Sequence, residues 1–391
     1  MRTLLVTGPG GAGRTTVAAA TALAAARDGL RVLLLTGDPV TGLDGSAGPA
    51  DPAGAGGRLT VRRLDPAAHF RAELLALQER AATALEVLGA ARLDEDELTE
   101  LPGSDRFAYL AALRDAARDA DHDLLVADLP PPRDAVALLA LPGQLRRYLR
   151  RLLPPERQAA RALRPVLAQL AGVPMPTDAL YRAAAERDAE LAVVQELVEA
   201  PTTSVRLVVE PGPAATEALR TARAGLALHG LALDRVVANR LLPATSPDPW
   251  LAALADRQRG HLKELYADGV PAVRELPHLG RDPHGADDLA HLARLGDLAP
   301  GAPVPAPRWP VEDRRETDGV LVWRIPLPGA TKPGLGLVRR GDELVLTVGP
   351  FRRVAPLPAA LRRCTVAGAA LRDGELLVRF RPDPGLWPRT P

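Results

Sequence analysis

The first sixteen residues constrain the fold more than any other stretch of the chain. Arg2 to Thr7 form a short apolar strand pattern, an alanine-rich helical run follows from Thr15, and residues 8–15 have the spacing G-x-x-x-x-G-[K/R]-[S/T]. Glycines in such a loop let successive backbone N–H groups point at one anion, and the next helix adds its N-terminal dipole. We therefore expect a phosphate-binding loop. Its residues would be Gly8, Gly10, Gly11, Ala12, Gly13, Arg14, Thr15 and Thr16.

The segments after this loop alternate between strand-like and helix-like patterns. Arg31 to Thr36 is a short apolar run typical of a buried parallel strand, and similar runs recur at residues 122–128, 204–210, 234–239 and 270–276. Strand, helix and parallel strand in succession form right-handed βαβ units. The predicted fold class is therefore α/β, a doubly wound, mostly parallel sheet of the P-loop type.

A helical insertion is expected within this nucleotide-binding domain, which we place at residues 1–298. Helical spacing of apolar residues covers about residues 66–120 and 145–200. Residues 135–141 also have a helical pattern and are predicted to form a separate helix before the second stretch. The insertion would therefore be built from several helices beside the sheet.

A second, smaller domain is predicted after a proline-rich linker at residues 299–316. From residue 317 to 391 the sequence changes to short alternating segments separated by glycine- and aspartate-containing turns. Such spacing is typical of antiparallel hairpins. We expect a small antiparallel β-sandwich.

Composition limits the partners and the chemistry. The 49 basic and 48 acidic residues give a formal net charge of +1, so no overall field directs the protein to nucleic acid. Cys364 is the single cysteine, which excludes an intrachain disulfide and a cysteine-rich metal site and suits a reducing compartment. No apolar run approaches the roughly 18 residues of a membrane span. We expect a cytoplasmic protein with no transmembrane segment and no nucleic-acid partner.

Three motifs in order resemble the ArsA family of P-loop ATPases, relatives of the arsenite-pump ATPase and of the tail-anchored-protein targeting ATPase. Residues 8–16, GPGGAGRTT, resemble the family's loop GKGGVGKTT. Residues 37–45, GDPVTGLDG, and residues 128–142, DLPPPRDAVALLALP, resemble its first and second switches. The resemblance covers about residues 1–300. The C-terminal segments, such as GDELVLTVGPFRR, resemble the α-crystallin-like domain appended to some relatives.

This resemblance implies that the chain binds ATP and Mg²⁺. Thr15 would place its hydroxyl on the metal, Asp128 would lie in the metal's outer shell, and Asp38 would orient the attacking water. Asn239 would contact the adenine. Without the resemblance, Asp128 would be interpreted as a solvated acid at a strand end and Asn239 as a turn residue.

Several positions depart from the family's pattern. Pro9 replaces the signature lysine that reaches the partner's nucleotide, and Arg14 replaces the loop lysine with a larger planar cation. In the second switch, Pro132 and Arg133 stand where the family has Thr-Gly, and Asp134 replaces a histidine. A catalytic charge contact of this kind contributes about 10³–10⁵ in rate. We therefore expect phosphate binding to be retained and hydrolysis to be weak or absent.

Two classes of function remain open. The chain is expected to be an ATP-binding protein whose nucleotide-controlled dimer acts on a protein partner or client. The dimer would be a homodimer, or a heterodimer in which an intact relative supplies the missing lysine. The alternative is a non-enzymatic scaffold or chaperone-like protein that has lost ATPase activity.

A cluster of arginines follows the second switch at helical spacing. It could form a surface for an acidic partner, but the preferred interpretation is a solvated helix face, since isolated charge patches are usually solvated. The residues are Arg146, Arg147, Arg150 and Arg151.

Overall fold

The protein is represented by a computed structural model. Part of the predicted first switch and the middle of the predicted helical stretch at 145–200 lie outside the residues it describes. Residues 178–180 are described by their backbone alone. The described residues are 1–40, 43, 57–82, 85–86, 89, 91–153, 178–270 and 272–387.

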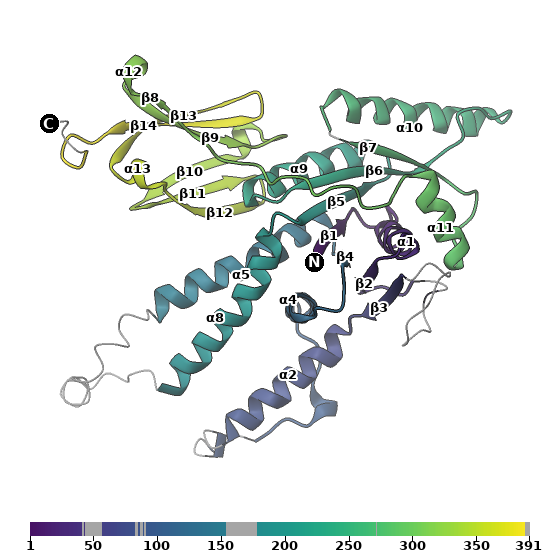
Figure 1. The fold of residues 1–391 in the computed structure, drawn as a ribbon, viewed down its shortest axis with the longest axis horizontal. Coiled ribbons are helices and arrows are strands. Elements are labelled where there is room, and N and C mark those ends of the chain that lie inside the picture. The colour runs from purple at the N-terminus through teal and green to yellow at the C-terminus, as the bar shows by residue number, and fades with distance from the viewer. Residues whose placement is uncertain are drawn as a thin grey trace.

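A sheet of seven parallel strands runs through the centre of the α/β part, in the order β3-β2-β4-β1-β5-β6-β7 (Figure 1). Because β1 pairs with β4 on one side and β5 on the other, the chain is wound to both sides of it. The predicted α/β class is confirmed. The strands are β1 (Arg2–Thr7), β2 (Arg31–Thr36), β3 (Arg58–Arg63), β4 (Leu124–Asp128), β5 (Thr203–Val209), β6 (Leu233–Leu241) and β7 (Val273–Pro277).

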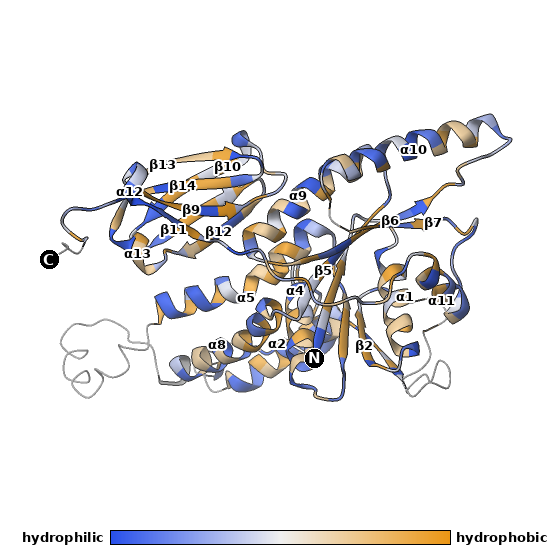
Figure 2. Cartoon of the chain, turned by 45° about the horizontal axis from the view of Figure 1, so that its top comes forward, coloured by the Kyte–Doolittle hydropathy of each residue, from blue (hydrophilic) through white to orange (hydrophobic). Residues whose placement is uncertain are grey.

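Both faces of the sheet are buried, as the near-continuous apolar runs of its strands require. Side chains alternate along each strand, so Leu5 and Leu125 pack into one core while Leu4 and Val126 pack into the other. The central strands are accordingly coloured mainly as hydrophobic in Figure 2. This burial holds the carboxyl ends of β1 and β4 next to each other.

Helices cover the two faces unequally. The face that contains Leu4 packs against α1 and α11, and the face that contains Leu5 packs against α4, α5, α8 and α9. The α/β part contains α1 (Arg14–Arg27), α2 (Pro66–Arg80), the 3-10 helix η1 (Glu95–Glu97), α4 (Asp105–Arg118), α5 (Pro132–Leu152), α8 (Asp178–Glu199), α9 (Pro213–His229), α10 (Pro249–Ala267) and α11 (Gly285–Leu295).

Two features of the helical part differ from the sequence-based expectation. The separate helices predicted before and after residue 142 are one helix, α5, with the buried Pro142 inside it. The helix continues through Pro142 because proline removes only one intrahelical N–H bond and the apolar face of α5 packs against the sheet. The sequence pattern does not predict the helix α10, because much of it faces solvent and only Ala255, Leu262 and Leu265 are buried.

The C-terminal part consists of two antiparallel sheets, ordered β10-β11-β12 and β13-β14-β9-β8. Asp373 and Gly374 both have positive φ, at 49° and 74°, as a two-residue hairpin turn requires. β8 begins at Val311, inside the stretch predicted as linker. The elements are β8 (Val311–Arg314), α12 (Arg315–Asp318), β9 (Val320–Pro326), η3 (Lys332–Gly334), β10 (Leu335–Arg340), β11 (Glu343–Val348), β12 (Phe351–Pro356), α13 (Ala359–Arg362), β13 (Cys364–Arg372) and β14 (Glu375–Pro382).

The sandwich packs directly on α9 (Figures 1 and 2). A Cβ at Gly225 would lie 2.5 Å from Cε2 of Phe351, so only glycine permits this close approach. Arg353 donates from Nη1 to the carbonyl of Leu228 at 2.7 Å, and its guanidinium lies 4.6 Å from the ring centroid of Trp309. The hydrophobic core therefore continues from the α/β part into the sandwich. Within the described part of the chain, no helix is long and apolar enough to span a bilayer.

Candidate phosphate-binding site

The loop between β1 and α1 owes its conformation to glycines. Gly11 and Gly13 have φ of 79° and 85°, which other residues rarely adopt. A Cβ at Gly8 would lie 2.2 Å from the carbonyl oxygen of Val208, and one at Gly13 would lie 2.3 Å from Nδ2 of Asn239. Side chains at these positions would push the loop off the sheet edge.

Backbone N–H groups gather at the end of this loop. The first intrahelical bond of α1 runs from Val17 N to the carbonyl of Gly13 at 3.0 Å, so the N–H groups of Arg14, Thr15 and Thr16 precede it. No acidic residue lies in the first turn of α1. Such a helix terminus attracts an anion through its N–H groups and its dipole.

The tip of the loop contributes differently. Ala12 donates its N–H to the carbonyl of Pro9 at 3.2 Å, which closes the turn and engages this donor. Gly10 and Gly11 are exposed, and a Cβ at either would meet no atom within 4 Å. The tip is therefore open on its outer side.

Two carboxylates lie in front of the helix terminus. The hydroxyl of Thr15 donates to Oδ2 of Asp128 at 2.6 Å and lies 3.5 Å from Oδ2 of Asp38. The guanidinium of Arg14 bridges the same two acids, from Nε to Asp128 at 3.1 Å and from Nη2 to Asp38 at 3.0 Å. Thr36 orients Asp38, accepting from its N–H at 3.1 Å and donating to its carbonyl at 2.8 Å. Residues from β1–α1, β2 and β4 thus meet at one point.

The two acids differ in exposure. The side chain of Asp128 is 1 % exposed and that of Asp38 is 59 % exposed. Burial raises the pKa of Asp128, while the hydrogen bond from Thr15 and the charge of Arg14 lower it. Burial, and then the charge of Asp128, raises the pKa of Tyr109 to about 12, so this phenol keeps its proton.

The oxygen atoms of this cluster suit Mg²⁺. Mg²⁺ prefers hard oxygen ligands and is commonly held by one or two protein oxygens together with phosphate oxygens and water. Thr15, Asp38 and Asp128 supply such oxygens beside the helix terminus. Among the residues described, no group of three or more His, Cys, Asp or Glu side chains could hold a metal ion. The metal would therefore need the phosphate oxygens as ligands.

Asn239 lies against the back of the loop. Its side chain is buried and donates from Nδ2 to the carbonyl of Ala12 at 2.8 Å. The next residue, Arg240, has a positive φ of 58° and donates to the carbonyl of Gly11 at 2.8 Å. It also lies 3.6 Å from Glu210. No motif pointed to Arg240, whose position follows from the end of β6 passing beside the loop.

The segment that resembles the second switch is held at its start by a hydrogen bond to β1. The hydroxyl of Thr7 donates to the carbonyl of Pro130 at 2.5 Å, which ties the segment after β4 to β1. Pro132 is buried in the first turn of α5, and Arg133 is exposed there. Asp134 pairs with Arg106 at 3.2 Å. Of the three second-switch residues that depart from the family's pattern, Arg133 alone is positively charged, and it is exposed.

The arginines after the second switch do not form a plain solvated face. Arg146 and Arg150 pair with Asp188 on α8, at 3.1 and 3.3 Å. Arg147 forms two bonds to Glu343 on β11, at 3.0 and 2.6 Å. The expectation of a solvated helix face is therefore wrong for Arg146 and Arg147, which tertiary partners hold, whereas Arg150 is paired but remains exposed to solvent.

Comparison with known proteins identifies the family. The profile of the anion-transporting ATPase family ArsA matches residues 1–295, and that of an HSP20-like domain found in ArsA matches residues 318–380. An uncharacterized protein of Streptomyces coelicolor is 60 % identical over the full length of both chains. A Mycobacterium tuberculosis protein is 32 % identical, covering 99 % of this chain and 97 % of its own length.

A putative arsenical pump-driving ATPase of Aquifex aeolicus is 27 % identical over 97 % of this chain and 99 % of its own. The relatives thus match both parts of the molecule. The chain belongs to the ArsA family of ATPases.

Proposed function

We propose that this protein binds Mg-ATP at the loop between β1 and α1 and hydrolyses it slowly or not at all. The observation that carries the proposal is the meeting of Arg14, Thr15, Asp38 and Asp128 in front of the N–H groups of the α1 terminus. The N–H groups would bind the terminal phosphates. Bound Mg²⁺ would neutralise charge on the phosphate oxygens.

Each side chain has a separate task in this proposal. Thr15 presents its hydroxyl oxygen to the metal, and Asp128 holds that hydroxyl in place through the 2.6 Å bond. Asp38, whose side chain is largely exposed, orients the water that attacks the terminal phosphate. Asn239 would contact the adenine through the part of its amide that does not bond Ala12.

Arg14 explains why binding would be retained while turnover is slow. Its Nε and Nη2 each bond a carboxylate, so only its remaining N–H groups can reach a phosphate oxygen while both acids stay in place. A planar guanidinium also demands a fixed geometry that an ammonium does not. Pro9 supplies neither a cation nor an N–H group.

Arsenite extrusion does not fit this chain. Soft metalloid ions prefer thiolate ligands. The single cysteine, Cys364, is buried in the sandwich. A nucleotide-controlled dimer that acts on a protein partner or client in the cytoplasm is the activity we propose instead. The partner chain would be a second copy or an intact relative that supplies the lysine missing at Pro9.

Titration of labelled ATP into the full chain, with and without Mg²⁺, tests this proposal. We expect Mg-dependent binding that falls about 10–100-fold in Arg14→Ala, because a bond to a charged group contributes about 1.5–3 kcal/mol. Asp28→Asn, at the opposite end of α1, is the matched control and should bind as the unchanged protein does. A folded protein with no affinity for Mg-ATP would refute the proposal and support the scaffold alternative.

A phosphate-release assay separates slow hydrolysis from none. We expect any Mg-ATP-dependent release to be lost in Asp38→Asn while ATP affinity stays within a few-fold. Binding without detectable release would place the chain among nucleotide-binding scaffolds. Release that survives in Asp38→Asn would contradict the role given to this residue.

A further inference from the structure

A cavity of about 430 Å³ lies where α5, α8, the end of α9 and β12 meet. One wall is apolar and includes Leu139, Val198 and Leu231. Polar side chains, among them Gln195 and Arg353, line the rest. Concave sites with an apolar wall and a few convergent polar groups, at a junction of two structural units, are typical of small-molecule binding sites.

Arg353 brings a positive charge to this cavity without a direct ion pair. It contacts the carbonyl of Leu228 and the ring of Trp309, and no carboxylate of the described residues, including Glu199 in the same cavity, lies within 4.0 Å of its guanidinium nitrogens. Glu199 raises its pKa through charge, but burial is the larger effect and lowers it. A cation removed from water without an ion pair favours a bound anion.

The remaining polar groups of the cavity are neutral or already paired, except for Arg352 and Glu199. Burial, followed by the charge of Arg353, lowers the pKa of His229 to about 4, so this imidazole is neutral at physiological pH. Arg147 is neutralised by its two bonds to Glu343. The amide of Gln195 accepts from Arg146 at 2.8 Å and donates to Glu199 at 2.9 Å, which leaves one of its N–H groups for a further acceptor. The charges of Arg352 and Arg353 outweigh the single carboxylate of Glu199, so the cavity carries a net positive charge.

A second cavity of about 410 Å³ provides a contrast. It lies among α2, α4, α5 and α8 and is mainly apolar. Both of its arginines are paired, Arg114 with Glu190 at 3.4 Å and Arg187 with Glu73 at 3.1 Å. This second cavity therefore offers no free cation, although its size is similar.

We propose that the cavity at α5, α8 and β12 binds a small organic anion, whose charged group bonds Arg353 and whose apolar body packs on Leu139 and Leu231. The neutral His229 and Gln195 would complete the hydrogen bonds of the anionic group. The cavity lies along the middle and second half of α5, whose first turn is nearer the phosphate-binding loop, and the proposal does not depend on nucleotide binding.

The probe for this test is 8-anilinonaphthalene-1-sulfonate, an aromatic body with one sulfonate, measured by fluorescence and calorimetry on the full chain. N-phenyl-1-naphthylamine has the same apolar body without the charge. We expect the sulfonate to bind at least about 10-fold more tightly, since a bond to a charged group contributes that much or more. Equal affinity for both probes would overturn the proposal.

Two variants locate the site. Gly143 lines the cavity, and a Cβ there would lie 3.7 Å from the side chain of Gln195, so Gly143→Leu fills space without a backbone clash and favours the helix. We expect it to reduce sulfonate affinity at least about 10-fold. Arg353→Gln should reduce affinity by a similar factor and should remove the preference for the charged probe.

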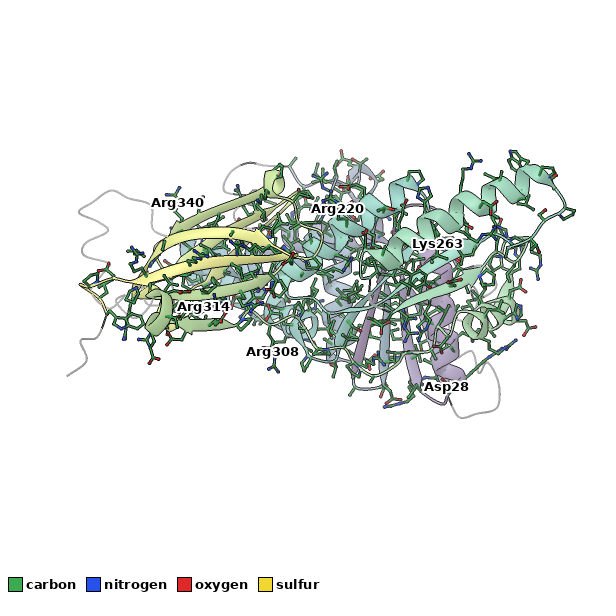
Figure 3. All side chains as sticks on the ribbon, turned by 90° about the horizontal axis from the view of Figure 1, so that it is seen from above. Asp28, Arg220, Lys263, Arg308, Arg314 and Arg340 are labelled. Atoms are coloured by element: carbon green, nitrogen blue, oxygen red, sulfur yellow. The ribbon has the colours of Figure 1, made fainter. Side chains whose placement is uncertain are left out.

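Arg340→Gln is the matched control, because Arg340 is exposed on the edge strand β10 at the outer side of the sandwich (Figure 3). It removes one arginine charge and should leave the affinity unchanged. If Arg353→Gln does not fold, Gly143→Leu and the probe pair decide the question on their own. Undiminished sulfonate binding in Gly143→Leu would show that the anion binds elsewhere.

Discussion

Arg14 in the phosphate-binding loop and Arg206 on β5 both bond aspartate, but they differ in how many of their donors are engaged. Arg206 is 0 % exposed, and its Nε and Nη2 both donate to Asp234, at 2.9 and 2.7 Å. Its Nη1 donates to the hydroxyl of Thr21 and to the carbonyl of Leu298. Four of the five guanidinium N–H groups are therefore accounted for.

Arg14 makes only two such bonds, one to Asp38 and one to Asp128. Its side chain is 19 % exposed, and donors remain for a further acceptor. The same chemical pair thus serves two purposes. The saturated and buried pair at Arg206 stabilises the fold, whereas the unsaturated pair at Arg14 leaves the cation able to exchange a carboxylate for a phosphate.

Removing the saturated arginine should have the largest effect. Arg206→Met leaves the buried Asp234 without its main partner, and we expect the free energy of unfolding to fall by about 3 kcal/mol. This loss of unfolding free energy is at the lower end of the range for broken buried ion pairs, because Arg235 remains 3.2 Å from Asp234 and still offsets its charge. Urea unfolding monitored by circular dichroism measures it. In Arg14→Met, the matched variant, the free energy of unfolding should fall by no more than about 1–2 kcal/mol. Equal losses in the two variants would show that the two arginines do not differ in their contribution to stability.

A partly buried histidine without a carboxylate partner gives the next largest effect. His229 has its pKa lowered from 6.5 to about 4, so the folded state resists protonation. This stability is fully present above pH 6.5 and is lost as the pH falls towards 4, by up to about 3 kcal/mol. Unfolding at pH 7 and pH 4.5 should show a smaller loss in His229→Gln than in the unchanged protein. Identical losses would contradict the assignment.

The partly exposed pair between Arg147 and Glu343 should give the smallest effect. Their side chains are 29 % and 33 % exposed, and pairs of this kind contribute about 0.2–1 kcal/mol. A double-mutant cycle of Arg147→Gln and Glu343→Gln, measured by unfolding, isolates this coupling. A coupling above about 2 kcal/mol would mean that α5 and the sandwich are held together as strongly as a buried pair.

Local sequence rules predicted the loop and the sheet well. Gly8 and Gly13 occupy positions where the backbone or a neighbouring side chain leaves no room for a Cβ atom. The spacing of the glycines in the sequence indicates this requirement for glycine. The central strands are short, nearly continuous apolar runs, and the turn at Asp373-Gly374 has the residues its conformation requires. In each case the sequence signal lies within a few residues of the chain, although the atoms that crowd Gly8 and Gly13 belong to Val208 and Asn239.

The contacts that define the candidate site are not local and were not predictable. Asp38 and Asp128 lie 24 and 114 residues from Arg14, so the sequence could not show that one guanidinium bridges both. The continuation of α5 through Pro142 depends on tertiary packing that outweighs the local preference. Arg240 belongs to no motif, and the fold alone brings it to the loop.

The length of α5 determines how far its second half would move if its first turn rotated. It starts at Pro132, beside the segment that follows Asp128, and carries Arg147, which holds Glu343 of the sandwich. At about 1.5 Å per residue, these two positions on the helix are roughly 22 Å apart. Pivoting by about 5° at the first turn would swing Arg147 by roughly 2 Å. A rotation of this size at the first turn of α5 would therefore be large enough to break the Arg147–Glu343 contact with the sandwich.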